Sequence, residues 1–230
     1  MISVMTVCYN RPTMLARLLD SLEEQEGFEW LLFDDNSKPE IELLARKFLE
    51  THPGQYVKSD IQDSERPKSV RYGVGINTLC TLAKGDIFTH FGSDSEATPG
   101  LFRQVLGGFQ GNAVYTGIQY RWADVETGQI LRKMACRYPK WLNYGKQIDG
   151  GSRSLDASQL YYKRECAVRW QEHHYFWFTA DVMAISAIID KAGRAYPLGD
   201  PLKNLLVYNN INRLSLTRLG SPEAVVEALR

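Results

Sequence analysis

The amino-acid sequence predicts an α/β fold with a mostly parallel, Rossmann-like sheet flanked by helices and a smaller mixed or antiparallel region in the second half. In the first half, short apolar segments alternate with amphipathic helical segments, which indicates parallel strands joined by helices. Polar and charged segments follow these strands directly, where ligands bind in such sheets. No internal repeat, low-complexity segment or linker interrupts the chain, so we expect a single domain over residues 1–230.

The first half contributes the alternating elements. Strands are predicted at residues 2–7, 29–33, 55–59 and 86–91. Helices are predicted at residues 14–24, at 40–49, in a segment ending near residue 84, and in one opening near Pro99. The first helix carries Leu15, Leu18, Leu19 and Leu22, a spacing that places all four on one face. Apolar β-branched runs such as residues 2–7 are typical of strands buried on both faces.

The second half is less regular. Residues 113–122 and 129–135 predict two strands around a turn at Thr127 and Gly128, in antiparallel arrangement. Residues 137–160 contain Pro, Gly and Ser, which favours a long loop or a binding region. Residues 179–192 have the apolar spacing of a helix.

Composition excludes some partners. Lys plus Arg and Asp plus Glu both number 27, so no overall field would gather nucleic acid or an anionic membrane, and we expect no nucleic-acid partner. The four cysteines are widely scattered and lack metal-ligand spacing, which favours a reduced intracellular protein. No signal peptide or membrane-spanning segment is evident. We expect a cytoplasmic protein that can work at the periphery of a membrane.

Acidic residues follow two of the predicted strands. Asp34 and Asp35 end the second strand, and Asp94 and Glu96 follow a Gly-Ser pair after a later one. Such acids can simply begin turns and cap helices. Carboxylate oxygens also suit Mg²⁺ or Mn²⁺, which could bridge the protein to a diphosphate. Recurrence at two strand ends favours the ligand site.

Arginines and aromatic residues supply further candidates. Arg66 and Arg71 lie in a polar segment that enters a helix, where arginine is commonly solvated. Near a diphosphate, either guanidinium could bind the oxygens as a fork, and spacing does not choose between them. The aromatic residues of 170–178 could stack on sugar faces or fill a core.

These motifs resemble a known family. The run TVCYNRP at residues 6–12, a Leu-rich helix, and LFDDNS at 32–37 resemble the start of the family 2 glycosyltransferases. Within that family, the chain also resembles the bacterial spore-coat polysaccharide nucleotide-diphospho-sugar transferases over about residues 1–110. The resemblance implies a GT-A fold and inverting transfer of a sugar from a UDP- or dTDP-sugar to an acceptor hydroxyl. It also implies a nucleotide-sugar-binding half at about 1–110 and an acceptor-binding half at about 111–230.

The resemblance carries roles onto individual positions. Tyr9 matches the aromatic residue that packs on the base, and Asp35 matches the carboxylate that hydrogen-bonds it. The full set of implied nucleotide-binding residues is Val7, Tyr9, Asp35, Arg66, Arg71 and Ser93. Asp94 matches the last acid of the DxD-like motif, the ligand of Mg²⁺ or Mn²⁺. Ser93 stands where the family has another acid, and Glu96 could compensate for it.

The general base of an inverting transferase must reach the attacking hydroxyl. Asp181 resembles the family's base by position, although an acid at a helix start can also stabilise the first turn. Glu172, Asp124 and Glu126 are the alternatives. The acceptor, which could be a saccharide, a lipid-linked sugar or a small molecule, is not specified.

Three other functions compete with this one. A non-catalytic nucleotide-sugar or glycan-binding module would account for Ser93 in place of an acid. A sugar-nucleotide pyrophosphorylase would open with a Gly-rich loop after the first strand, which CYNRP is not. A retaining transferase on the same fold would differ in product stereochemistry.

Overall fold

The computed structural model describes residues 1–124, 126–127, 129–133, 155–172, 180–199 and 205–211. Its first half has the predicted alternation of strands and helices. In chain order the elements are β1 (Ile2–Cys8), α1 (Pro12–Leu22), β2 (Phe28–Asp34), α2 (Pro39–Leu49), β3 (Gly54–Lys58), a 3₁₀ turn η1 (Asp63–Lys68), α3 (Arg71–Leu82), β4 (Ile87–His90), β5 (Ser95–Ala97) and α4 (Leu101–Gly108). The second half contains β6 (Ala113–Tyr115), β7 (Gly117–Ala123), β8 (Ile130–Lys133), η2 (Ala157–Gln159), β9 (Leu160–Lys163), η3 (Arg164–Cys166), α5 (Ala180–Ala192), β10 (Tyr196–Pro197) and β11 (Leu205–Ile211).

The main sheet has the order β10-β6-β9-β4-β1-β2-β3 within the described residues. The pairs β1–β2, β1–β4, β2–β3 and β6–β10 are parallel, whereas β9 runs antiparallel to both β4 and β6. The predicted mostly parallel sheet is therefore confirmed. The segment predicted as a loop, residues 137–160, ends where β9 (Leu160–Lys163) begins. The sequence does not predict β9, because its four residues are too few to give a periodic signal.

A second sheet has the order β5-β11-β7-β8. The predicted antiparallel pair of the second half corresponds to β7 and β8. The single strand predicted at 113–122 is divided: β6 joins the main sheet and β7 the second one. Thr116 lies at the division, where its backbone N–H donates to the Gln159 carbonyl at 3.0 Å and its own carbonyl accepts from Gln159 Nε2 at 2.7 Å.

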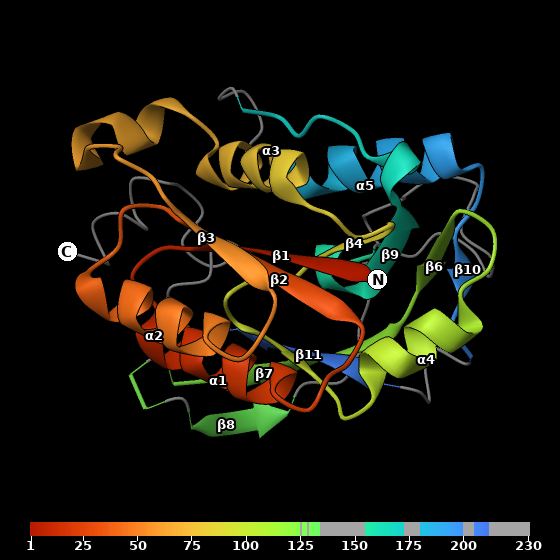
Figure 1. The fold of residues 1–230 in the computed structure, drawn as a ribbon, viewed down its shortest axis with the longest axis horizontal. Helices are drawn as coiled ribbons and strands as arrows, with labels where there is room; N and C mark the ends of the chain where they lie inside the picture. The colour runs from red at the N-terminus through yellow and green to blue at the C-terminus, as the bar shows by residue number, and fades with distance from the viewer. Residues whose placement is uncertain (125, 128, 134–154, 173–179, 200–204, 212–230) are drawn as a thin grey trace.

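Helices cover both faces of the main sheet, with α3 and α5 on one side and α1, α2 and α4 on the other (Figure 1). Each side has its own apolar cluster. Leu residues of α1 pack with Trp30 and Phe102 in one, and Ile76, Trp170 and Ile185 belong to the other. Burial of these side chains is the main stabilising term of the fold. In the described part of the chain, no helix is long and apolar enough to cross a bilayer.

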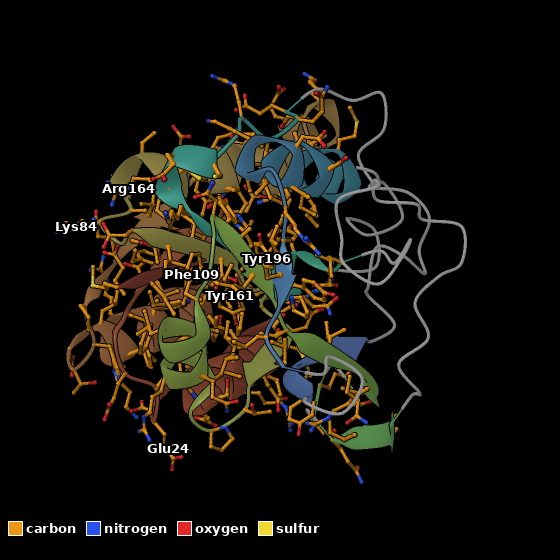
Figure 2. All side chains as sticks on the ribbon, turned by 90° about the vertical axis from the view of Figure 1, so that its right-hand side faces the viewer. Glu24, Lys84, Phe109, Tyr161, Arg164 and Tyr196 are labelled. Carbon is orange, nitrogen blue, oxygen red and sulfur yellow. The ribbon has the colours of Figure 1, made fainter. Side chains whose placement is uncertain are left out.

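Buried polar contacts fix the start of β4. Glu29 on β2 is buried, and its Oε1 accepts the Ser3 hydroxyl at 2.7 Å and the Gly85 N–H at 2.9 Å. Arg164 lies beside Lys84 at the rim of the molecule, and Tyr161 lies in its interior (Figure 2). At the rim, the Arg164 guanidinium donates a hydrogen bond to the Gly85 carbonyl at 2.6 Å. These contacts set the register of β4 and so the position of the loop that follows it.

Three of the four cysteines lie in the described residues, and all three are free thiols: Cys8, Cys80 and Cys166. Burial raises the pKa of the Cys8 thiol to about 12 and that of Cys80 to about 11. Both thiols therefore stay protonated near neutral pH and are poor nucleophiles. Cys136 lies outside the described residues.

His90, the last residue of β4, is a buried titratable side chain. Its Nε2 lies 2.6 Å from the Tyr162 hydroxyl, and its ring packs against Trp170. Burial lowers the pKa of His90 to about 3, so the native state excludes a proton that the unfolded chain binds below about pH 6.5. We expect the stabilising effect of His90 to be complete above pH 6.5 and to fall by about 1.4 kcal/mol per pH unit on acidification.

The measurement compares urea unfolding of the wild type and His90→Gln between pH 7.5 and 4.5. The wild type is expected to lose stability faster than the variant as the pH falls. Parallel pH curves would show that burial does not exclude the proton from His90.

Candidate active site

The loops after β1, β2 and β4 meet at one edge of the main sheet, because parallel strands end together. Asn10 and Asn36 have φ of 50° and 58°, a left-handed conformation that Asn tolerates better than most residues. Asn10 Oδ1 accepts the Lys38 N–H at 2.9 Å, and the Ser37 hydroxyl accepts the Asn10 N–H at 3.0 Å. The first two loops are thus tied to each other.

The two adjacent aspartates at the end of β2 have different surroundings. Asp34 is fully buried and accepts the Ser37 N–H at 2.8 Å and the Tyr56 hydroxyl at 2.6 Å. It therefore closes the turn after β2, as expected for a turn-forming acid. The Asp35 carboxylate makes a different set of contacts, with arginine side chains of the following segments.

Asp35 is paired with both predicted arginines. The Asp35 side chain is 3% exposed. Its Oδ1 accepts hydrogen bonds from Nη2 and Nε of Arg71 at 2.7 and 2.9 Å, and its Oδ2 pairs with Nη1 of Arg66. Arg71 opens α3 and also donates to the Ser59 hydroxyl at 2.9 Å. Arg66 and Arg71 lie 31 and 36 residues after Asp35 in the sequence, and the three side chains form one charged cluster.

Tyr9 adds an aromatic face to this cluster. The Arg66 guanidinium carbon lies 3.7 Å from the centre of the Tyr9 ring, and Asp63 Oδ1 accepts both Arg66 Nε at 2.9 Å and the Tyr9 hydroxyl at 3.2 Å. Burial, opposed by Arg66, raises the pKa of Tyr9. A pocket of about 560 Å³ opens here, large enough for a small ligand. It is lined by Tyr9, Asn10, Asn36, Ser37, Lys38, Gln62, Asp63 and Ser64.

Asp94, in the loop after β4, is paired with Arg11. Arg11 Nη1 lies 3.1 Å from Asp94 Oδ2, and the two side chains are 14% and 15% exposed. Burial raises the pKa of Asp94, the Arg11 charge lowers it, and the nearby Asp156 raises it further. Ser93 is buried and hydrogen-bonds the Cys8 thiol. The sequence alone gives Arg11 no role, because a lone arginine before a helix is most often solvated. Its place in the run at residues 6–12 is the signal that could have pointed to it.

Glu96 is neutralised by its own partners. Arg17 Nη2 lies 2.6 Å from Oε1, and Arg121 Nη1 lies 3.3 Å from Oε2. The Arg121 guanidinium in turn stacks over the Tyr208 ring, 3.2 Å from its centre. These contacts join α1 to the second sheet, so a structural role accounts for Glu96 better than compensation for Ser93 does.

The candidate bases of the second half are placed only in part. α5 begins at Ala180, so Asp181 lies in its first turn as predicted, while its side chain lies outside what the structure describes. Glu172 is half-buried and accepts Asn77 Nδ2 at 2.6 Å. Asp124 Oδ1 accepts the backbone N–H groups of Glu126 and Thr127, which makes it a turn residue.

Val7 packs beneath α3. A Cβ on Gly75 would lie 2.6 Å from Val7 Cγ2, so a side chain there would separate the helix from β1. Among the aromatic residues predicted to bind sugar or fill a core, Trp170 is buried in the core cluster, and residues 173–179 lie outside the described residues.

The site can accommodate a divalent cation in one way. Among the described residues, no three His, Cys, Asp or Glu side chains come together to hold a metal by themselves. Asp94 nevertheless supplies a hard carboxylate oxygen, and Mg²⁺ is commonly held by one or two carboxylates together with substrate phosphates. Asp94 therefore fits a cation whose other ligands come from a diphosphate and water.

The family model for glycosyl transferase family 2 matches residues 3–172, which includes every strand-end loop described above. The chain belongs to glycosyl transferase family 2. The prediction of the family from the motifs at residues 6–12 and 32–37 is thereby confirmed. The GT-A fold class is likewise confirmed by the structural relatives of this family member.

This chain is similar to a curated protein in sequence and to several solved structures in fold. Protein CgeD of Bacillus subtilis (strain 168) is 28% identical over 121 residues, which is 50% of this chain and 28% of CgeD. The crystal structure of S. aureus TarS superposes with a TM-score of 0.59 at 15% identity, over 91% of this chain and 36% of TarS. Glucosyl-3-phosphoglycerate synthase from Mycobacterium tuberculosis, solved with Mn²⁺, UDP and glucosyl-3-phosphoglycerate, gives 0.57 at 14% identity, over 99% of this chain and 77% of that one. The chain thus spans 28% of the length of CgeD and 36% of that TarS chain, well under two thirds of either.

Proposed function

We propose that this family 2 chain transfers a sugar from a UDP- or dTDP-sugar to an acceptor hydroxyl with inversion at the anomeric carbon. The observation that supports it best is the cluster of Tyr9, Asp35, Arg66 and Arg71 beside a pocket at the carboxyl edge of the sheet. The aromatic face of Tyr9 and the acceptor oxygens of Asp35 suit a nucleotide base. The guanidinium groups of the two arginines suit the oxygens of a diphosphate. UDP complexes of the TarS fragment 1–349 and of the mycobacterial synthase add support.

The base is proposed to bind between Tyr9 and Asp35. Arg66 makes the two contacts that a base would make, since its planar guanidinium stacks on the Tyr9 ring and donates to Asp35. Arg66 would therefore turn toward the phosphates when the base enters, while Arg71 keeps Asp35 in place. Val7 and Ser93 complete the proposed nucleotide site at the ends of β1 and β4.

Asp94 is the proposed ligand of Mg²⁺ or Mn²⁺. Held between Asp94 and the phosphates, the cation would offset the negative charge that the departing nucleoside diphosphate gains. The chain's own residues would position the donor: Tyr9 and Asp35 the base, and Arg66 or Arg71 the phosphate oxygens. Fixed charges of this kind stabilise a transition state without reorganising during the reaction.

Asp181 is the proposed general base, which would take the proton of the acceptor hydroxyl as the sugar is transferred. Its place at the start of α5 belongs to the half of the chain, about residues 111–230, that we propose binds the acceptor. The nucleotide sugar would be bound by about residues 1–110. A saccharide, lipid-linked or small-molecule acceptor fits this proposal, and a cytoplasmic chain could meet a lipid-linked one at the membrane surface.

One observation favours a second candidate function, a non-catalytic nucleotide-sugar-binding module. Ser93 replaces an acid, and the remaining Asp94 is already paired with Arg11. Such a module would bind the nucleotide but would not turn over any donor. A pyrophosphorylase would need a Gly-rich loop after β1, where this chain has CYNRP. A retaining transferase on the same fold is distinguished from the proposed inverting one by the stereochemistry of its product.

Calorimetric titration of UDP and dTDP, with and without Mn²⁺, tests the nucleotide site. Removing the stacking face in Tyr9→Ala is expected to weaken UDP binding by about ten- to hundredfold, since base–aromatic stacking contributes about 1–3 kcal/mol. Tyr56→Ala is the matched control, because Tyr56 also hydrogen-bonds an aspartate of this edge but does not line the pocket. Failure of both nucleotides to bind wild type under any metal condition would contradict the proposal.

A further inference from the structure

Arg11 is held where it can act on a diphosphate. Its backbone carbonyl accepts the Leu15 N–H at 2.9 Å and so starts α1, and the preceding Asn10 is bonded to Ser37 and Lys38. The base of the Arg11 side chain is therefore fixed from both sides. The guanidinium reaches Asp94 across the edge of the sheet and is mostly buried there.

The other arginines of this edge are paired with different acids. Arg66 and Arg71 pair with Asp35, and Arg17 and Arg121 pair with Glu96. Arg11 forms an ion pair with Asp94, the acid that we propose to bind Mg²⁺ or Mn²⁺. Because Ser93 supplies no carboxylate beside Asp94, a divalent ion and Arg11 would compete for the Asp94 carboxylate, to which Asp156 adds a further negative charge nearby. The Arg11 guanidinium and a divalent ion bound to the same carboxylate would be close enough to repel each other. The negative charge of a diphosphate would offset that repulsion.

We propose that Arg11 is a further residue that binds the sugar donor, through the diphosphate, while it stays paired with Asp94. Arg11 therefore competes with the divalent cation for the Asp94 carboxylate. This inference rests on the proposed nucleotide-sugar site. A guanidinium has five N–H donors in a rigid fork, so one group can pair with a carboxylate and a phosphate together. Two consequences follow: the protein binds UDP without metal, and Arg11 weakens the binding of metal in the absence of nucleotide.

The test uses two titrations that need no turnover, UDP into protein in EDTA and Mn²⁺ alone into metal-free protein. Arg11→Gln is expected to bind UDP in EDTA about tenfold or more weakly than wild type, the size of one charged hydrogen bond. The same variant is expected to bind Mn²⁺ alone several-fold more tightly. In saturating Mn²⁺, UDP affinity should change less than in EDTA. Arg11→Lys should recover part of the metal-free binding, since it keeps the charge without the fork.

Arg17→Gln is the matched control. It removes the same charge from α1, but Arg17 pairs with Glu96 and not with Asp94, so both titrations should resemble wild type. Thermal unfolding of each variant confirms that it is folded. The inference is overturned if Arg11→Gln matches wild type in both titrations, or if wild-type protein binds UDP only with Mn²⁺. If wild type binds no UDP with or without Mn²⁺, the proposed function fails and this inference fails with it.

Discussion

Asp94→Asn is expected to reduce turnover of the nucleotide sugar by about a hundred- to a thousandfold, the usual cost of losing one group that stabilises the leaving charge. Asparagine has nearly the same shape but lacks the charge that holds a divalent cation. The Mn²⁺-dependent gain in UDP affinity should disappear, whereas UDP binding in EDTA should persist because Arg11 is retained. The measurements are UDP release from a panel of UDP-sugars and calorimetry with and without Mn²⁺.

Glu96→Gln is the control for this effect. Glu96 lies two residues from Asp94 and carries the same charge, but Arg17 and Arg121 hold it. We expect this variant to lose stability while its metal response stays close to wild type. Equal loss of the Mn²⁺ response in both variants would instead place the cation between the two acids, and an unchanged response in Asp94→Asn would remove Asp94 from the metal site.

The sequence predicts β1 and β2 well because each has a run of mostly apolar residues, which is typical of a buried parallel strand. It fails where elements are short or where partners are distant. β5 and β9 have three and four residues, and they become strands only through pairing with β11, β4 and β6. The division of residues 113–122 between two sheets depends on Gln159, which no local pattern connects to Thr116.

In the site, too, the sequence predicts features that have a local signal and misses those that depend on distant residues. The strand-end acids Asp35 and Asp94 are evident from the order of elements, since carboxyl ends of parallel strands meet. Their counter-ions are not: Arg11 lies 83 residues from Asp94, and only the folded chain brings them together. Residue type and position alone allow Asp34 and Asp35 the same roles, and only the family resemblance points to Asp35. Their hydrogen bonds separate a turn residue, Asp34, from a member of the charged cluster, Asp35.

Asp35→Asn is expected to have the second large effect, on both nucleotide binding and stability. UDP affinity should fall by about ten- to hundredfold, since a hydrogen bond to a charged group contributes about 1.5–3 kcal/mol. The free energy of unfolding should fall by about 3 kcal/mol, the lower end of the range for breaking a buried pair, because the Asn oxygen still accepts a hydrogen bond from an arginine. Calorimetry with UDP and urea unfolding measure the two effects.

Asp34→Asn separates these effects, because Asp34 ends the same strand and is equally buried. Its partners, the Ser37 N–H and the Tyr56 hydroxyl, are neutral, so no buried ion pair is broken. We expect a loss of about 1.5 kcal/mol in stability, the lower end of the range for one hydrogen bond to a charged group, and little change in UDP affinity. Loss of UDP affinity in Asp35→Asn alone would mean that the carboxylate contacts the nucleotide directly or positions the arginines that do. Equal loss in both variants would mean that the turn after β2, and not the Asp35 charge, determines nucleotide binding.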